Sequence, residues 1–278
     1  MTISPKNQGR TGRLAGRNIG IDRVEDRIRA EGGDRTTKVA LITGGSRGLG
    51  ATLAAFLAAQ DYDVILDARD ERALRETARA VEHYGTRVIP IAGNVAEAHH
   101  RRRLVAAAED LGRLDLLVNN ASQLGPTPLP PLIDYPLDAL DEVLAVNVVA
   151  PLALMQEALP LLEATGGQIV NVSSDAAIGG YPGWGGYGAS KAALDLISLT
   201  LANELRGRGV SVVSVDPGDM RTRMHQAAFP GEDISDRPLP ETTIPFWAWF
   251  LARDRSEVSG HRFQAQAEVW DRPLGVRQ

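Results

Sequence analysis

Cysteine is absent from this chain of 278 residues, and lysine is nearly absent. Without cysteine there is no disulfide, no thiolate metal site and no thiol nucleophile, and the lack of disulfides fits a reducing compartment. No apolar run approaches the roughly 18 residues of a membrane span. The net charge of −5 argues against a dedicated nucleic-acid-binding domain, which is normally basic. We therefore expect a cytoplasmic protein without a metal site, whose partner is neither a nucleic acid nor a membrane.

The hydrophobic residues, 44% of the chain, can build a sizeable core, and the length suits one large α/β domain. Residues 1–36 differ: they hold eight basic and five acidic residues and few large apolar side chains. Burial of so few apolar side chains cannot offset the conformational entropy lost when the chain becomes ordered. We expect a mobile N-terminal extension over residues 1–36, in which residues 19–30 could form a short helix, and a folded domain over residues 37–278. The Arg-rich start leaves a targeting peptide open as an alternative.

Short apolar runs alternate with helical patterns from Lys38 onward, which is typical of repeated βαβ units around a parallel sheet. The pattern predicts strands at residues 39–43, 63–67, 87–91, 114–118, 168–172, 210–215 and 261–265. It predicts helices at residues 49–60, 71–84, 96–111, 137–162 and 241–252, with another between the fifth and sixth strands and a loop over residues 216–240. Pro151 and Pro160 are expected to kink and end the long helix. The fold class is a single-domain, doubly wound parallel α/β sheet of the Rossmann-like kind.

A glycine-rich segment, Thr-Gly-Gly-Ser-Arg-Gly-Leu-Gly at residues 43–50, follows the first strand directly. Gly44, Gly48 and Gly50 allow a tight turn and let a pyrophosphate approach backbone N–H groups at the start of the next helix. Glycines also make ordinary turns. The position between a strand and a helix at the start of a βαβ series nevertheless favours a dinucleotide site.

Tyr187 and Lys191 stand four residues apart in a chain whose only other lysines are Lys6 and Lys38. On a helix, positions i and i+4 share a face. A cation beside a tyrosine favours the ionised phenol and lowers its pKa, which would suit proton transfer in catalysis. We therefore predict that Lys191 lowers the pKa of Tyr187.

Several motifs in order make the chain resemble the short-chain dehydrogenase/reductase family over about residues 38–266. The glycine segment matches the family's Thr-Gly-x-x-x-Gly-x-Gly, and residues 119–122 resemble its Asn-Asn-Ala-Gly. The catalytic tetrad of the family is matched by Asn147, Ser174, Tyr187 and Lys191. Residues 216–218 with Thr222 resemble its Pro-Gly-x-x-x-Thr segment.

The resemblance implies that Tyr187 exchanges a proton with a carbonyl or alcohol oxygen while a nicotinamide exchanges hydride with the carbon. Lys191 would lower the pKa of the tyrosine and bind the nicotinamide ribose. Ser174 would position the substrate oxygen, and Asn147 would hold a water that connects Lys191 to solvent. Taken singly, Ser174 could merely cap a turn, Asn147 could satisfy buried backbone and Tyr187 could be a packing residue.

The end of the second strand bears on the choice of cofactor, because NAD-binding relatives place there an acid that bonds the ribose hydroxyls. The equivalent position here is Ala68, followed by Arg69, and Arg47 lies in the glycine segment. Two guanidinium groups suit a 2′-phosphate, so we expect NADP(H). NAD(H) stays possible, since Asp67 is one position away and Arg69 could be a solvated turn residue. The predicted cofactor-binding residues are Gly44, Ser46, Arg47, Gly48, Leu49, Gly50, Arg69, Asn94, Val95, Asn120, Ala121, Ser122, Tyr187, Lys191, Pro217, Gly218 and Thr222.

Two positions depart from the family pattern. Asn94 stands where the family usually has Asp near the adenine, and we expect retained binding with altered contacts. Ser122 replaces a glycine near the cofactor, and we expect it to add bulk only.

A small carbonyl or alcohol is the expected substrate, and the apolar pocket wall predicted for it comprises Tyr181, Trp184, Met224 and Phe229. The run His-His-Arg-Arg-Arg at residues 99–103 looks like a metal or nucleic-acid site in isolation, but at the start of a helix it is predicted to be a solvated face. Family members form homodimers or homotetramers, which the resemblance implies here too. The alternatives to an NADP(H)-dependent carbonyl reductase are an NAD-dependent alcohol dehydrogenase and a non-catalytic, dinucleotide-binding regulatory protein.

Overall fold

The computed structural model describes residues 37–271. The predicted mobile extension over residues 1–36 lies outside the described residues, together with the helix expected at 19–30 and the alternative of a targeting peptide. No helix among the described residues is long and apolar enough to cross a membrane.

Seven parallel strands form one sheet in the order β3-β2-β1-β4-β5-β6-β7. The strands are β1 (Lys38–Ile42), β2 (Tyr62–Ala68), β3 (Val88–Ala92), β4 (Leu116–Asn119), β5 (Gln168–Val172), β6 (Ser211–Asp216) and β7 (Arg262–Gln264). The order reverses between β1 and β4, so the chain is wound in two directions from that point. In such sheets ligands bind in the crevice beyond the carboxyl ends of the strands at the reversal.

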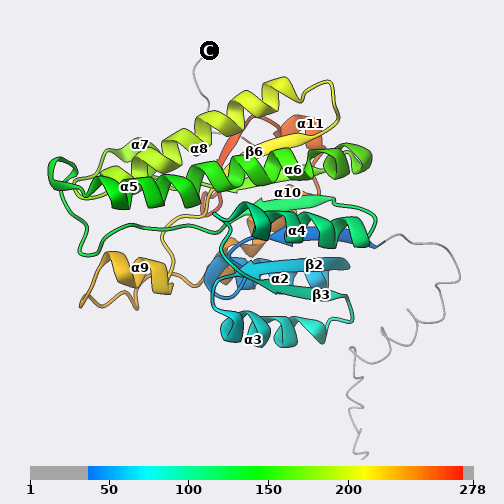
Figure 1. Ribbon diagram of the computed structural model, residues 1–278, viewed down its shortest axis with the longest axis horizontal. Coiled ribbons are helices and arrows are strands. Elements are labelled where there is room, and N and C mark those ends of the chain that lie inside the picture. The colour runs from blue at the N-terminus through cyan, green and yellow to red at the C-terminus, as the bar shows by residue number, and fades with distance from the viewer. Residues whose placement is uncertain (1–36, 272–278) are drawn as a thin grey trace, which may run out of the picture. The chain divides into compact units, whose positions relative to one another are not determined.

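Helices cover both faces of the sheet (Figure 1). One face packs against α2 (Gly48–Ala59), α3 (Glu71–Glu82) and α10 (Ile244–Leu251), and the other against α4 (Ala98–Asp110), α6 (Ala150–Thr165) and α8 (Gly185–Glu204). In Figure 1, α8 and α6 lie in the upper part of the view, and α3 lies below β2 and β3. The remaining elements are η1 (Leu132–Asp134), α5 (Leu137–Leu144), η2 (Ala145–Val149), α7 (Ala176–Gly179), α9 (Arg223–Ala228), η3 (Pro240–Thr243) and α11 (Arg255–Val258).

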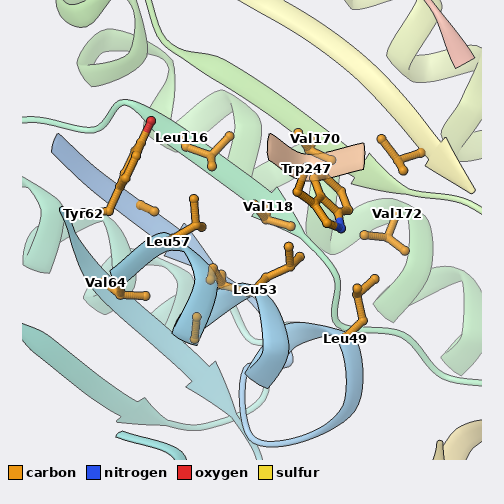
Figure 2. Packing of buried hydrophobic residues seen from close by; sticks show 14 of the residues in the cluster. Leu49, Leu53, Leu57, Tyr62, Val64, Leu116, Val118, Val170, Val172 and Trp247 are labelled. Atoms are coloured by element: carbon orange, nitrogen blue, oxygen red, sulfur yellow. The ribbon is translucent and has the colours of Figure 1, made fainter. Parts of the chain in front are cut away.

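The helix after the glycine segment is held by an apolar stripe. Leu49, Leu53 and Leu57 of α2 recur every four residues, share one face and are each at most 5% exposed. Figure 2 shows them directed at buried strand residues such as Val64 and Val118. Each buried leucine contributes about 1.5–3 kcal/mol relative to an exposed one. This packing fixes the start of α2 beside the carboxyl ends of the strands.

The helix predicted over residues 137–162 is three segments: α5, the π-helical turn η2 and α6. Pro151 directly follows the junction of η2 and α6, and the chain stays helical across it. Pro160 lies inside α6 and does not end it, because the helix continues to a left-handed Gly166 at its C-cap. The predicted loop over residues 216–240 contains α9. The helix predicted over residues 241–252 is divided into η3 and α10, which begins at Ile244. The other predicted strands and helices agree with their ranges to within two residues.

Candidate active site

A cavity of about 1240 Å³ lies beyond the carboxyl ends of the strands and is larger than a typical site for a drug-sized ligand. All predicted cofactor-binding residues except Gly50 line it, and so do Ser174, Tyr187 and Lys191 of the tetrad. Asn147 is fully buried and does not line it. The structure therefore gathers residues from seven separate chain segments around one space that has room for a dinucleotide and a substrate.

The glycine segment leaves room for a bound pyrophosphate because its glycines carry no side chains. Gly44 and Gly48 have φ of +68° and +55°, a region that favours glycine. A Cβ on Gly50 would lie 2.3 Å from the carbonyl oxygen of Gly44, so this glycine serves the packing of the turn rather than the cavity surface. The backbone N–H groups that begin α2 thus stay open to an anion.

Asn120 holds the glycine segment in place. Its Nδ2 donates to the carbonyl oxygens of Thr43 and Gly44 at 2.8 and 3.1 Å. The hydroxyl oxygen of Thr43 in turn accepts from the backbone N–H groups of Asn120 and Ala121, both at 3.0 Å. The side chain of Asn120 is therefore engaged with protein backbone, and its neighbour Ala121 forms the cavity surface.

At the end of β2, Asp67 lines the cavity and forms a buried pair with His100. Its carboxylate lies 2.6 Å from Nε2 of His100, and both side chains are 2% exposed. The backbone N–H of Gly44 also hydrogen-bonds Asp67, and the Asp67 carbonyl accepts from Gly45 at 2.7 Å. Burial raises the pKa of Asp67, and the His100 hydrogen bond opposes that rise. Asp67 therefore joins the glycine segment to α4.

The prediction of a solvated face at residues 99–103 is wrong for two of its members. His100 and Arg101 are 1% and 7% exposed, because this side of α4 faces the sheet. Arg101 donates to the carbonyl oxygens of Val95 and Ala96, both at 2.9 Å. His99, Arg102 and Arg103 are exposed as expected. No group of three or more potential metal ligands occurs within residues 37–271.

Two guanidinium groups lie near the end of β2: Arg69 directly follows the strand, and Arg47 precedes α2. Arg69 is exposed and lines the cavity. Arg47 pairs with Asp70 at 2.5 Å, and Asp70 also accepts from the N–H of Ala73 as the N-cap of α3. Ala68 is 7% exposed and brings no charge to this end of the cavity. The predicted Asn94 lies nearby, where its Oδ1 accepts from the N–H of Ala96 at 3.1 Å.

Tyr187 and Lys191 lie one turn apart on α8 and are 9% and 2% exposed. The Lys191 ammonium donates to the backbone carbonyl of Val172 at 2.7 Å. It lies 5.5 Å from the centre of the Tyr187 ring. Burial lowers the pKa of Lys191 to about 8, and the charge of Asp195 opposes this change.

The prediction that Lys191 lowers the pKa of Tyr187 is wrong for this structure. Burial raises the pKa of Tyr187 above its usual value, because the charged phenolate loses its hydration. Hydrogen bonding by the hydroxyls of Ser122 and Ser174 lowers the pKa, and the charges of Asp216 and Asp175 raise it. Burial is the largest of these effects, so the phenol is protonated at neutral pH.

Asn147 occupies the π-helical turn η2 and uses its whole side chain within the protein. Its Oδ1 accepts from the N–H of Gln123 at 2.7 Å and from the Ser122 hydroxyl at 3.2 Å. Its Nδ2 donates to the Gln123 carbonyl and to the Ser190 hydroxyl, both at 2.9 Å. All four hydrogen-bonding positions of the amide are taken, so the side chain itself has no position for the expected water.

Ser122 was expected to add bulk only, and that expectation is wrong. Its hydroxyl donates to Oδ1 of Asn147, and it lowers the pKa of the Tyr187 phenol. Sequence reasoning missed this role because no spacing rule connects the loop after β4 with η2 and α8.

Ser174 lies between the phenol and a surface network. Its hydroxyl donates to Asp175 at 3.0 Å and accepts from the N–H of Ala176 at 3.1 Å, so it also caps a turn. Its backbone carbonyl accepts from Arg262 at 2.8 Å, and Arg262 pairs with Asp195 and Asp216 as well. Arg262 was not predicted, and no local signal marks it, because it lies 88 residues from Ser174.

Aromatic rings continue the cavity wall from Tyr187. Trp184 lies edge-on to Tyr187 with centroids 5.8 Å apart, and 6.0 Å from Phe229. Phe229 lies 4.9 Å from the ring of His225 on α9. Tyr181 and Met224 line the same cavity. The space beside the phenol is therefore bounded by apolar surface, as predicted.

Residues 38–233 match the model of the short chain dehydrogenases. The chain belongs to this family. It is therefore an oxidoreductase with a nucleotide-binding Rossmann-like fold, and the family binds NAD(P) and small-molecule substrates.

Individual relatives cover most of the chain. A rhamnolipid-biosynthesis 3-oxoacyl-[acyl-carrier-protein] reductase of Pseudomonas aeruginosa is 37% identical over 220 residues, 76% of this chain and 83% of the relative. A solved structure from Pseudomonas syringae has a TM-score of 0.78 with 36% identity, covering 82% of this chain and 94% of its own. A structure from Escherichia coli CFT073, complexed with NADPH, has a TM-score of 0.77 with 31% identity, covering 83% and 97%.

Proposed function

We propose that the protein is an NADP(H)-dependent oxidoreductase that interconverts a carbonyl and a secondary alcohol. The observation that carries the proposal is the buried phenol of Tyr187, which faces the cavity beside Lys191 and two serine hydroxyls. The bound nicotinamide would supply or accept hydride at the substrate carbon. Tyr187 would give a proton to the substrate oxygen or take one from it, as general acid or base. Ser174 would hold that oxygen, and Lys191 would hold the nicotinamide ribose.

The phenol of Tyr187 is protonated at neutral pH, and this is the form that can donate a proton to a carbonyl oxygen. The apolar wall formed by Trp184, Phe229 and Met224 favours a substrate with an uncharged, apolar body.

Preference for NADP(H) is supported by the charges at the end of β2. Arg69 and Arg47 offer two guanidinium groups, and Ala68 brings no carboxylate. Of the two acids close by, Asp67 pairs with His100 and Asp70 pairs with Arg47. The Escherichia coli relative with NADPH bound is consistent with this choice. An NAD-dependent alcohol dehydrogenase is the alternative.

The deciding experiment measures NADPH consumption against ketones, quinones, keto-esters, steroids and 3-oxoacyl thioesters, the last chosen because of the Pseudomonas aeruginosa relative. Turnover with NADPH that exceeds turnover with NADH, and that falls by at least about 10³-fold in Tyr187→Phe, is the expected result. Activity that survives unchanged in Tyr187→Phe would remove the catalytic assignment. NADPH binding without turnover of any substrate would favour a regulatory protein.

We also propose that the enzyme acts in the cytoplasm as a homodimer or homotetramer. The absence of cysteine supports a reducing compartment. Val149 and Leu196, on η2 and α8, are 58% and 66% exposed and would be covered by helix packing between subunits. Sedimentation at micromolar concentration tests the association.

A further inference from the structure

We propose that Arg262 is a positioning residue of the active site, whose guanidinium fixes the backbone of Ser174 and thereby holds the Ser174 hydroxyl toward the substrate oxygen. This role rests on the proposed function, because it acts through a residue of the predicted tetrad. Arg262 begins β7, beyond residues 38–233 that match the family model, and it does not line the cavity. Its part in the site therefore follows from its hydrogen bonds.

The guanidinium of Arg262 binds three segments of the chain. Its Nη2 donates to the backbone carbonyl of Ser174 at 2.8 Å and to Oδ2 of Asp216 at 3.3 Å. Its Nε donates to Oδ2 of Asp195 at 3.0 Å. These partners belong to the turn after β5, the end of β6 and the helix α8. The side chains of Arg262 and Asp216 are only 13% and 4% exposed, so these contacts are largely shielded from water.

Two carboxylates orient the guanidinium. Asp195 lies one turn after Lys191 on α8, and Asp216 uses its other oxygen to accept from the N–H of Gly218 at 3.0 Å. Burial raises the pKa of Asp216, and the contacts with Gly218 and Arg262 oppose that rise. An arginine presents its donors in a rigid, planar fork. Contacts with α8 and β6 therefore fix the direction in which the remaining donor meets Ser174.

The backbone carbonyl of Ser174 is anchored from two sides. Besides the hydrogen bond from Arg262, it accepts from the N–H of Ala177 at 3.1 Å, and a carbonyl oxygen has two lone pairs. Because this carbonyl carbon is bonded to the Cα of Ser174, the two hydrogen bonds restrict rotation about ψ of this residue. The hydroxyl is carried on the same Cα, and a catalytic group must be held within about 0.5 Å of its productive position. Arg262 therefore acts on catalysis through Ser174.

A double-mutant cycle tests this path of action. In carbonyl reduction with NADPH, Arg262→Met should lower kcat about 10- to 100-fold, because a displaced Ser174 hydroxyl no longer holds the substrate oxygen. NADPH affinity should change by less than about threefold, since Asp216 keeps its hydrogen bond from Gly218. In a Ser174→Ala background, Arg262→Met should lower kcat by less than about threefold. Equal fold losses of kcat in the two backgrounds would overturn the inference.

Two further variants separate positioning from a general effect on stability. Arg255→Met is the matched control, because Arg255 is a partly buried arginine that donates to the backbone carbonyls of Thr165 and Gly166, before β5 and at the other end of that strand from Ser174. It should lower stability and leave kcat unchanged.

Arg262→Lys keeps a cation between the two carboxylates and should fold like wild type. Its single ammonium cannot donate from both the Nε and the Nη2 positions, so kcat should still fall by at least about threefold. A wild-type kcat in Arg262→Lys, or a loss of kcat in Arg255→Met equal to that in Arg262→Met, would overturn the inference.

A substrate-free measurement separates failure of this role from failure of the proposed function. Serine labelled with carbon-13 at the carbonyl and aspartate labelled with nitrogen-15 together report on Ser–Asp peptides, which occur at residues 174–175 and 235–236. The signal lost in Asp236→Asn belongs to Ser235, which leaves the other for Ser174. We expect the Ser174 carbonyl resonance to move in both Arg262 variants and to stay in place in Arg255→Met, with Ser235 unmoved in all. A resonance that moves without turnover of any substrate would support the contact and reject the proposed function. A Ser174 resonance that stays in place in both Arg262 variants would reject the contact, whatever the activity.

Discussion

Asp67 and His100 form a buried pair in which a carboxylate oxygen lies 2.6 Å from an imidazole nitrogen, although 33 residues separate them in the chain. The pair joins the end of β2 to α4 beside the cavity, which Asp67 lines. Because Asp67 also bonds the first glycines of the phosphate-binding segment, the pair positions that segment as well.

Replacement of His100 by Ala should destabilise the protein by about 3 kcal/mol, because removal of one partner leaves a buried carboxylate without its main neighbour. NADPH affinity should fall with it, since the glycine segment loses a support. Urea unfolding and NADPH titration measure the two effects. His99→Ala, an exposed histidine one residue away, is the control and should change stability by less than about 0.5 kcal/mol.

A second substitution should reveal the contact between His100 and the loop after β3. A Cβ on Gly93 would lie 2.2 Å from Nδ1 of His100, so Gly93→Ala should cost about 1–3 kcal/mol of stability through overpacking. In the His100→Ala background the space is free, and the same substitution should cost much less. A double-mutant cycle should give a coupling energy of at least about 1 kcal/mol. Purely additive effects would contradict the proposed contact.

The positions of the local motifs could be predicted from the sequence, because a strand, a glycine turn and an i, i+4 pair are each encoded within a few residues. From these positions we could also predict the parallel sheet, and that Gly44, Tyr187 and Lys191 lie around one site. The inward direction of His100 could not be predicted, because an Arg-rich, His-rich run gives no apolar stripe to orient α4. The π-helical turn was also missed, since a helical apolar period does not reveal one extra residue in a turn. Ser122 and Arg262 depend on contacts between distant segments, which no spacing rule encodes.

Arg69→Ala should weaken NADPH binding about 10- to 100-fold and leave NADH binding nearly unchanged. The reason is that a charge-assisted hydrogen bond contributes about 1.5–3 kcal/mol, and only NADPH carries the 2′-phosphate that would accept it. Fluorescence titration with both cofactors measures the ratio. Arg72→Ala on α3, which does not line the cavity, serves as the charge-matched control. Equal losses for the two cofactors would mean that Arg69 does not contact the phosphate.

Gly50→Ala should abolish measurable NADPH binding, or lower the affinity by more than about 100-fold. The added Cβ would lie 2.3 Å from a backbone oxygen of the glycine segment, and backbone cannot move aside as a side chain can. Gly207→Ala is the control, because a Cβ there meets no atom within 4 Å. Thermal unfolding of both variants shows whether the loss is local. Normal NADPH affinity in Gly50→Ala would contradict the assigned packing of the turn.

Lys191→Met should abolish catalysis and yet stabilise the fold at neutral pH. Burial lowers the pKa of Lys191 from 10.5 to about 8, so keeping the charge below pH 8 costs the folded state about 3 kcal/mol. Loss of the charge-assisted hydrogen bond to Val172 offsets about 2 kcal/mol of that cost, which leaves a net gain of roughly 1 kcal/mol at pH 7.

The same substitution makes a pH prediction with a definite sign. Because the folded pKa of Lys191 lies below the unfolded value, the unfolded state binds more protons between about pH 8 and 10.5, and this lysine's contribution to stability rises with pH across that window. The stability advantage of Lys191→Met should therefore shrink from pH 8 upward and vanish or reverse near pH 10.5. Both proteins keep Tyr187, so its own titration largely cancels in the difference. Urea unfolding at pH 7 and pH 10 measures the change, with the exposed Lys38→Met as the control. An advantage that stays constant between these pH values would show that Lys191 is not charged at a cost in the folded protein.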